Sequence, residues 1–206
     1  YFQLVSAWEA RGRVPITTGD DFLIAHLIEQ YVLWAKNYYV KSDGSLTSQM
    51  SVIRPALRRL NELHGYSSID DYGPPELKAT RQTLITQGLC RTTVNKYVGI
   101  IKHCFKWGVE EGYVPPAVYG GLQAVSGLRP GRSKAPERKP VTCVSTEHVE
   151  AVLEFLPDQV SSMIRLQLLS GARPGEIVRL RPVDLDLAGD VWCATLSEHK
   201  TSHHGK

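Results

Sequence analysis

The sequence predicts a mainly α-helical protein, and three observations support this fold class. Apolar residues recur at spacings of three and four through most of residues 20–127, which is the period of one face of an α-helix. Gly, Pro and Asp residues separate these stretches, as they do at helix boundaries. Hydrophobic residues make up 42% of the 206 residues and charged residues 22%, so the chain can bury a core and wholesale disorder is excluded.

Five helices are expected in the first part of the chain, and the fourth has the clearest apolar stripe. That stripe includes Val94, Val98, Ile101 and Phe105, and Gly112 ends it. The expected ranges are about 20–38, 50–65, 74–88, 91–112 and 115–127. Residues 2–11 are interpreted as one more helix that precedes this block, in an N-terminal arm over residues 1–19.

The last part of the chain predicts shorter helices followed by a strand. Helices are expected over residues 147–156 and 160–169, with Gly171 ending the second of them. Pro174 fits the first turn of a third short helix, where its missing N–H costs nothing. A β-branched and aromatic run over residues 191–196 predicts a strand, and we expect its pairing strand after Lys206.

Charge divides the chain into a helical block, a basic linker and an acidic block. Residues 128–139 carry five Lys or Arg against one Glu, a net charge of +4 within twelve residues. The segment before it carries +2 and the segment after it −3. We therefore expect a helical domain over 20–127, a linker over 128–141 and a further domain over 142–206. The linker would either lie beside a polyanion or serve as a solvated connector, and charge alone leaves both open.

The remaining composition excludes several classes of protein. No apolar run approaches the roughly 18–20 residues needed to cross a bilayer, so no membrane partner is expected. The four cysteines are far apart and form no CxxC pair, which indicates reduced thiols in a cytoplasm rather than a disulfide scaffold. The sequence shows no basic-then-apolar leader, and its first residue, Tyr1, suggests a piece of a longer protein.

Residues 170–186 contain the pattern with the most specific chemistry. Arg173 follows a Gly-terminated helix and precedes a Pro-started one, so its guanidinium lies at a helix N-terminus that already favours an anion. An arginine fork can hold two oxygens of one phosphate. Glu176, three residues later, can cap that helix or brace Arg173. The alternative is a surface arginine beside an ordinary capping glutamate.

A second candidate surface is a basic cluster at the start of the fourth helix. Helix starts rich in donors contact phosphates and reach into major grooves, which predicts DNA binding. The alternative is a solvated helix face. The candidate residues are Arg91, Thr92, Thr93, Asn95, Lys96, Lys102 and Lys106 here, Arg54 and Arg58 on the second helix, and Arg129, Arg132 and Lys134 of the linker.

Histidines near the end of the chain could hold a transition metal, because imidazole is a common ligand. These are His199, His203 and His204. The sequence has no HExxH motif and no acidic residue at the spacing of a metal site near these histidines. We therefore favour histidines that face phosphate or solvent, and we expect no metal or other cofactor.

Residues 170–186 closely resemble box I of the tyrosine recombinases, the phage-integrase family. The family pattern is T/S-G-x-R-x-x-E-x-x-x-L-x-x-x-D-(I/L)-D, and it is matched here by Gly171, Arg173, Glu176, Leu180, Asp184, Leu185 and Asp186. The segment His199-Lys200-Thr201 follows a strand where the family carries its catalytic lysine. Residues 91–116 resemble the last long helix and the exit of the family's core-binding domain.

The resemblance implies a helical SAM-like core-binding bundle, a linker and the start of an α+β catalytic domain, which together clamp double-stranded DNA. Family members cleave DNA through a 3′-phosphotyrosyl bond and rejoin it without metal or ATP. Arg173 would stabilise the charge on the scissile phosphate, with Glu176 in support, and Lys200 would protonate the leaving 5′-oxygen. The family assembles as tetramers on paired sites, so a homo-oligomer on nucleoid DNA in the cytoplasm is expected.

The sequence also departs from the family. The second catalytic box, with its His/Lys-x-x-Arg motif and nucleophilic tyrosine, does not occur in it, and all nine tyrosines precede Arg173. We therefore expect these 206 residues alone not to cleave DNA. The alternative function is that of a helical DNA-binding or regulatory protein without chemistry, in which Arg173 only caps a helix.

Overall fold

A computed structural model describes residues 22–41 and 43–195 and confirms that the chain is mainly helical. The described residues form eight α-helices, one short 3₁₀ helix and one two-stranded sheet. The chain divides into two compact units, Tyr1–Lys139 and Pro140–Lys206. The helix expected over residues 2–11 lies outside the described residues.

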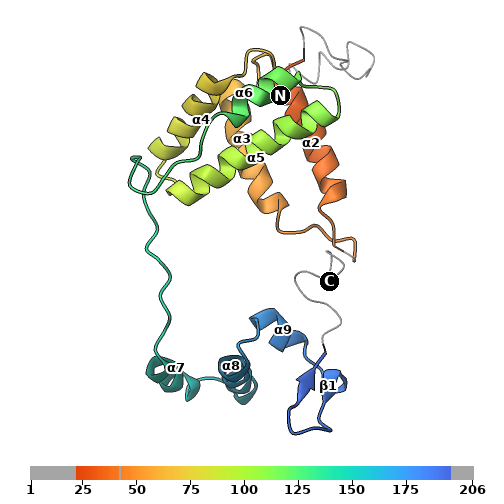
Figure 1. Cartoon of the computed structure of the whole chain (residues 1–206), viewed down its shortest axis with the longest axis vertical. Coiled ribbons are helices and arrows are strands. Elements are labelled where there is room, and N and C mark those ends of the chain that lie inside the picture. Colours follow the sequence, from red (N-terminus) through yellow and green to blue (C-terminus); the bar gives the residue numbers. More distant parts are fainter. Residues whose placement is uncertain (1–21, 42, 196–206) are drawn as a thin grey trace. The chain divides into compact units, whose positions relative to one another are not determined.

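The first unit contains the five helices that periodicity predicts (Figure 1). They are α2 (Ile24–Tyr38), α3 (Met50–His64), α4 (Pro74–Thr86), α5 (Arg91–Glu110) and α6 (Pro116–Gln123). Helix α2 begins at Ile24, later than expected, because Leu23 is extended and forms a β-bridge with Ser68. Helix α4 begins after Gly73, whose N–H donates to the Glu76 carboxylate at 2.8 Å.

Helix α5 is the centre of this unit, since it contacts each of the other four helices. Its apolar stripe is buried against the stripes of its neighbours, as the periodicity predicts. The most completely buried side chains of the unit include Tyr31, Tyr72, Phe105, Leu27, Leu57, Leu60, Leu84 and Ile101. Trp107 lies off the centre of the apolar stripe, and periodicity does not assign it to the core. The structure buries it against Tyr31 and Trp34, with ring centroids 5.5 and 5.7 Å away.

Gly108 allows α5 to approach its neighbours closely, and enlarging it is expected to destabilise the unit. A Cβ atom there would lie 2.5 Å from Val114 Cγ2 and 2.7 Å from Leu27 Cδ1, both in the core. Overpacking of this kind costs about 3 kcal/mol, so Gly108→Val should lower the melting temperature by about 10 °C or more in a thermal unfolding scan. A Cβ atom at Gly99 on the same helix would meet no atom within 4 Å, so Gly99→Val is the control. Equal melting temperatures for the two variants would contradict this packing.

The second unit is built from shorter elements and has little core of its own. It contains α7 (Thr146–Leu153), α8 (Asp158–Ser170), α9 (Pro174–Arg179), a 3₁₀ helix (Pro182–Asp184) and strands β1 (Leu185–Asp186) and β2 (Cys193–Ala194). Among its described residues only Leu153 and Ile177 are buried. Of the strand expected over 191–196, only Cys193–Ala194 forms a strand, β2, among the described residues. It pairs antiparallel with β1, which precedes it in the chain.

Candidate nucleic-acid interface

The basic cluster predicted on α5 is divided between two faces of that helix. The exposed face carries residues spaced by four and three positions, the repeat of a single helix face. These are Thr92, Lys96, Gly99, His103 and Lys106. Near the end of this row Lys106 Nζ lies 3.1 Å from Glu110 Oε1, and this hydrogen bond raises the pKa of Lys106. The result is an exposed row with two cations, Lys96 and Lys106, and a central glycine. His103 in this row hydrogen-bonds through Nδ1 with the Tyr31 hydroxyl at 2.8 Å.

The other face of α5 binds the basic linker, which folds back onto this helix within the first unit. Asn95 makes two hydrogen bonds to the backbone of Leu128: its Nδ2 donates to the carbonyl at 3.0 Å, and its Oδ1 accepts from the N–H at 2.8 Å. The Arg91 guanidinium lies 2.6 Å from Glu137 Oε1, and the Arg91 N–H donates to the Pro136 carbonyl at 2.9 Å. The stretch 128–137, predicted as part of a linker, is thus docked on α5.

Lys102 belongs to this linker-facing side as well. Its ammonium donates to the Val125 carbonyl, just after the end of α6. Partial burial, together with the charge of Arg81, lowers the pKa of Lys102. Arg91, Asn95 and Lys102 therefore use their polar atoms to hold other segments of the protein. Lys96 is exposed, and Lys106, also exposed, pairs with Glu110 on the same helix.

Removing the amide of Asn95 is expected to release the start of the linker. Asn95→Ala leaves both backbone groups of Leu128 without this partner, a loss of about 1–2 kcal/mol. We expect hydrogen exchange at the Leu128 amide to become roughly tenfold faster. Lys96→Ala changes the exposed face of the same helix and is the control. An unchanged exchange rate in Asn95→Ala would show that the linker is held elsewhere.

Thr92 and Thr93 surround the thiol of Cys90 at the start of α5. Their hydroxyl oxygens lie 3.3 and 3.1 Å from Cys90 Sγ. Hydrogen bonds from these hydroxyls stabilise the thiolate and lower the pKa of Cys90 to about 6. The two predicted DNA-binding threonines thus have a partner within the protein.

The predicted arginines of α3 are both exposed. Arg54 and Arg58 lie four residues apart on the solvent side of the helix. Arg58 Nε is 3.5 Å from Glu62 Oε1, and the same carboxylate accepts from Arg59 at 2.8 Å. The Glu62 carboxylate therefore pairs with two arginines of α3, Arg58 and Arg59.

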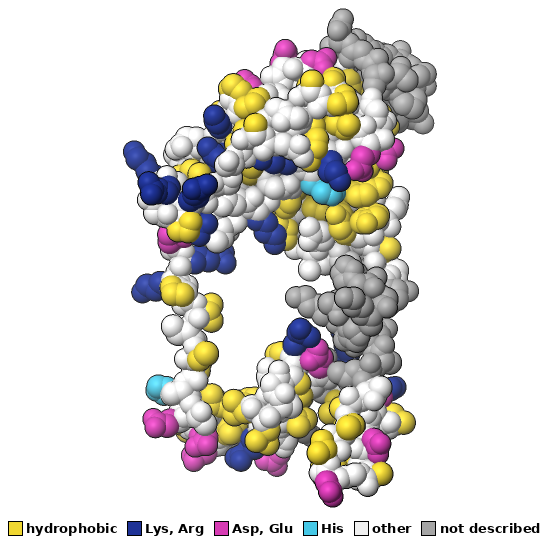
Figure 2. Space-filling view, in the orientation of Figure 1, with side chains coloured by type: hydrophobic (Ala, Val, Ile, Leu, Met, Phe, Trp, Pro, Cys, Tyr) yellow, Lys and Arg dark blue, Asp and Glu magenta, His cyan; other side chains and the backbone are white. Residues whose placement is uncertain are grey.

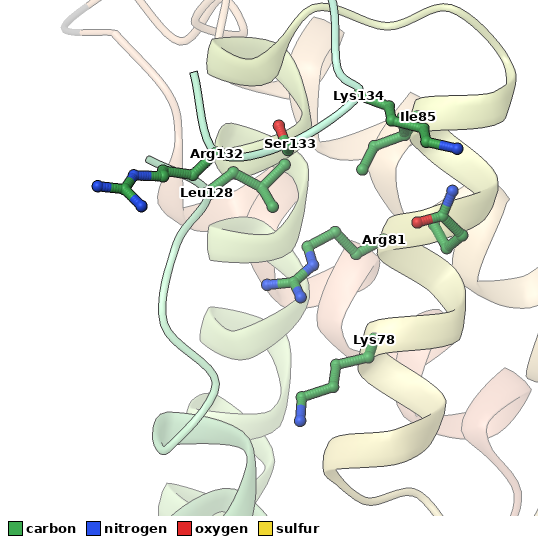
Figure 3. A pocket seen from close by; sticks show the side chains of 8 residues that line it. Lys78, Arg81, Ile85, Leu128, Arg132, Ser133 and Lys134 are labelled. Carbon is green, nitrogen blue, oxygen red and sulfur yellow. The ribbon is translucent and has the colours of Figure 1, made fainter. Parts of the chain in front are cut away.

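A basic pocket that the sequence did not reveal lies between α4 and the linker (Figure 3). Two cations predicted in the linker, Arg132 and Lys134, line it from one side, and Lys78 and Arg81 of α4 extend into it from the other. Figure 2 shows Lys and Arg side chains gathered on this part of the first unit. Arg129 is exposed on the same stretch of chain. Lys78 and Arg81 are one helical turn apart, and that spacing was the signal available in the sequence.

In the second unit Arg173 has the local geometry that its pattern predicts. Gly171 ends α8 in the left-handed conformation (φ +65°), and Arg173 is the residue that precedes α9. Glu176 accepts from the Arg173 N–H and from its guanidinium, both at 2.8 Å. The Arg173 side chain remains 66% exposed while that of Glu176 is 21% exposed, so the pair presents a cation to solvent. Lys200 and His199, His203 and His204 lie outside the described residues.

Comparisons with protein-family models, with curated proteins and with solved structures found no match for this chain. Assignment to a family therefore depends on the residues themselves. In the part of the chain that the structure describes, no helix is long and apolar enough to cross a membrane. Within those same residues, no group of three or more His, Cys, Asp or Glu side chains could hold a metal ion.

Proposed function

We propose that this chain is part of a tyrosine-type site-specific recombinase, in which the first unit is a SAM-like core-binding domain on double-stranded DNA. The observation that carries the proposal is the solvent-facing Arg173 guanidinium, held by Glu176 at the start of α9 within a box I sequence. The exposed cations of α5, α3 and the linker support DNA as the partner, because phosphate contacts supply most of the affinity in such interfaces.

In this function the second unit contributes cations to phosphoryl transfer. Negative charge grows on the non-bridging oxygens of the scissile phosphate, and a guanidinium held in place before the reaction stabilises that charge. Glu176 positions Arg173, since it binds both its backbone and its side chain. Lys200 would protonate the 5′-oxygen that leaves. The nucleophile would be a tyrosine of a second box, forming a 3′-phosphotyrosyl bond, and the enzyme would assemble as an oligomer on paired sites.

A second function, a helical DNA-binding or regulatory protein without chemistry, is favoured by one detail of the same pair. Glu176 accepts from the Arg173 backbone N–H, which is the geometry of a helix cap. Reading the coding sequence beyond residue 206 separates the two functions. An HxxR motif followed by a tyrosine within a domain's length supports the recombinase, whereas a stop codon supports the binding protein.

A further inference from the structure

We propose that the pocket between α4 and the linker is a preformed site for backbone phosphates of duplex DNA, independent of DNA sequence. This inference rests on the proposed DNA-binding function and adds a specific contact to it. The pocket has a volume of about 430 Å³ and is lined by Lys78, Arg81, Gln82, Ile85, Leu128, Arg132, Ser133 and Lys134. Four of these eight residues are cationic and none is acidic, so the site selects an anion.

The position of the linker side of the pocket is set by contacts outside it. Leu128, at the pocket wall, is fixed by the two hydrogen bonds from Asn95. Ala135, just after Lys134, is 7% exposed, and the Arg91–Glu137 pair follows it. The backbone that carries the linker cations is therefore held at both ends before an anion binds, and a site built this way loses less entropy on binding than a mobile tail.

The α4 side is oriented in a similar way. Arg81 Nη1 donates to the Ser126 carbonyl at 2.9 Å, which holds the guanidinium toward the linker and leaves its other N–H groups for a ligand. Burial and, after it, the positive charge of Arg81 lower the pKa of Lys102, so Arg81 lies within range of a further cation. The four cations that line the pocket also repel one another, and a bound phosphate relieves that repulsion.

The lining residues favour a phosphodiester backbone over a nucleotide. None of them is aromatic, and Gln82 is the only amide among them, so the pocket offers no surface on which a base could stack and little to read its edge. Phosphate contacts fix the register of a protein on a duplex without reading sequence. The site would thus fix where the DNA backbone passes between α4 and the linker.

Binding to a 30-base-pair duplex, followed by fluorescence anisotropy at several salt concentrations, tests the proposal. Lys78 and Lys134 are both exposed, so the double variant Lys78→Gln/Lys134→Gln should fold normally. We expect it to bind about tenfold more weakly at 100 mM salt, with a salt slope smaller by about 2, for any duplex sequence. The control Lys36→Gln/Lys41→Gln removes two exposed cations at the end of α2, away from α4 (Figure 1), and should change affinity less than twofold.

A change of charge at Gln82 separates loss of binding from loss of folding. Gln82→Lys should tighten duplex binding severalfold and Gln82→Glu should weaken it, at the same exposed position. Equal affinities for the pocket variants and the control would overturn the phosphate site while leaving DNA binding intact. Wild-type chain that binds no duplex at low salt would instead contradict the proposed function, and the pocket proposal with it. Competition by AMP that is much stronger than by inorganic phosphate would mean a nucleotide site and would also overturn it.

Discussion

Binding of the chain to duplex DNA is expected to weaken about a thousandfold when the salt concentration rises from 50 to 200 mM. The exposed cations are distributed over α3, the exposed face of α5, α4 and the linker. If about six of them neutralise phosphates, the logarithm of affinity falls with the logarithm of salt concentration with a slope of about −5, from the release of counterions. Fluorescence anisotropy with a labelled duplex measures both the affinity and the slope.

The two faces of α5 provide an internal comparison for this result. Lys96→Gln/Lys106→Gln removes cations from the exposed face and should reduce the salt slope by about 2. Lys102→Gln removes a cation whose ammonium is bound to the Val125 carbonyl, so it should leave the slope nearly unchanged. A slope near zero for the wild-type chain would exclude an interface built on phosphates. Equal changes in salt slope for the variants of the two faces would show that the exposed face of α5 does not contact DNA.

The helices of the first unit were accessible to sequence reasoning because local signals determine them. The apolar stripe of α5 and the Gly112 stop mark that helix within two residues, and the prolines at 74 and 116 begin α4 and α6. Helix α2 is the exception. Its start depends on the bridge between Leu23 and Ser68, a contact across 45 residues that no local pattern contains.

The candidate interface was predictable in composition but not in arrangement. Helical spacing alone separates Lys96 from Asn95, yet it does not say which face meets the linker. That is decided by the Asn95–Leu128 hydrogen bonds, which join residues 33 positions apart. The pocket depends on the same docking, since it brings Arg132 and Lys134 to Arg81. Composition alone describes the linker as an unattached connector. It therefore does not show that Lys78 and Arg81 of α4 lie beside the linker cations.

In the second unit, too, local sequence signals predict the helix ends but not the contacts between distant residues. Gly171 and Pro174 predict the end of α8 and the start of α9, and Glu176 at the third helical position predicts the bond to Arg173. The pairing of β2 with β1 was not expected, because a two-residue strand such as Leu185–Asp186 has no periodicity to recognise. What a short strand pairs with is determined by tertiary contacts.

In a protein that continues past residue 206 into a tyrosine-containing second box, Arg173→Ala is expected to reduce covalent protein–DNA adducts about 10²- to 10³-fold. This is the usual effect of removing one preorganised donor to a transition-state oxyanion. A nicked duplex traps the adduct, which is measured by gel electrophoresis in denaturing detergent. The affinity for duplex should change little, because Arg173 is one cation among many.

Two matched variants show whether the effect belongs to the Arg173 guanidinium. Arg165→Ala removes an exposed arginine of α8 in the same unit and should leave adduct formation unchanged. Glu176→Gln weakens the hold on Arg173 without removing it, so an intermediate yield is expected from a positioning role. Undiminished adducts in Arg173→Ala would remove this residue from the chemistry. A loss of adducts that follows a loss of DNA affinity would make it a binding residue instead. A guanidinium that acts on the transition state must lower adduct yield while the duplex remains bound, and only that combination assigns Arg173 to strand cleavage.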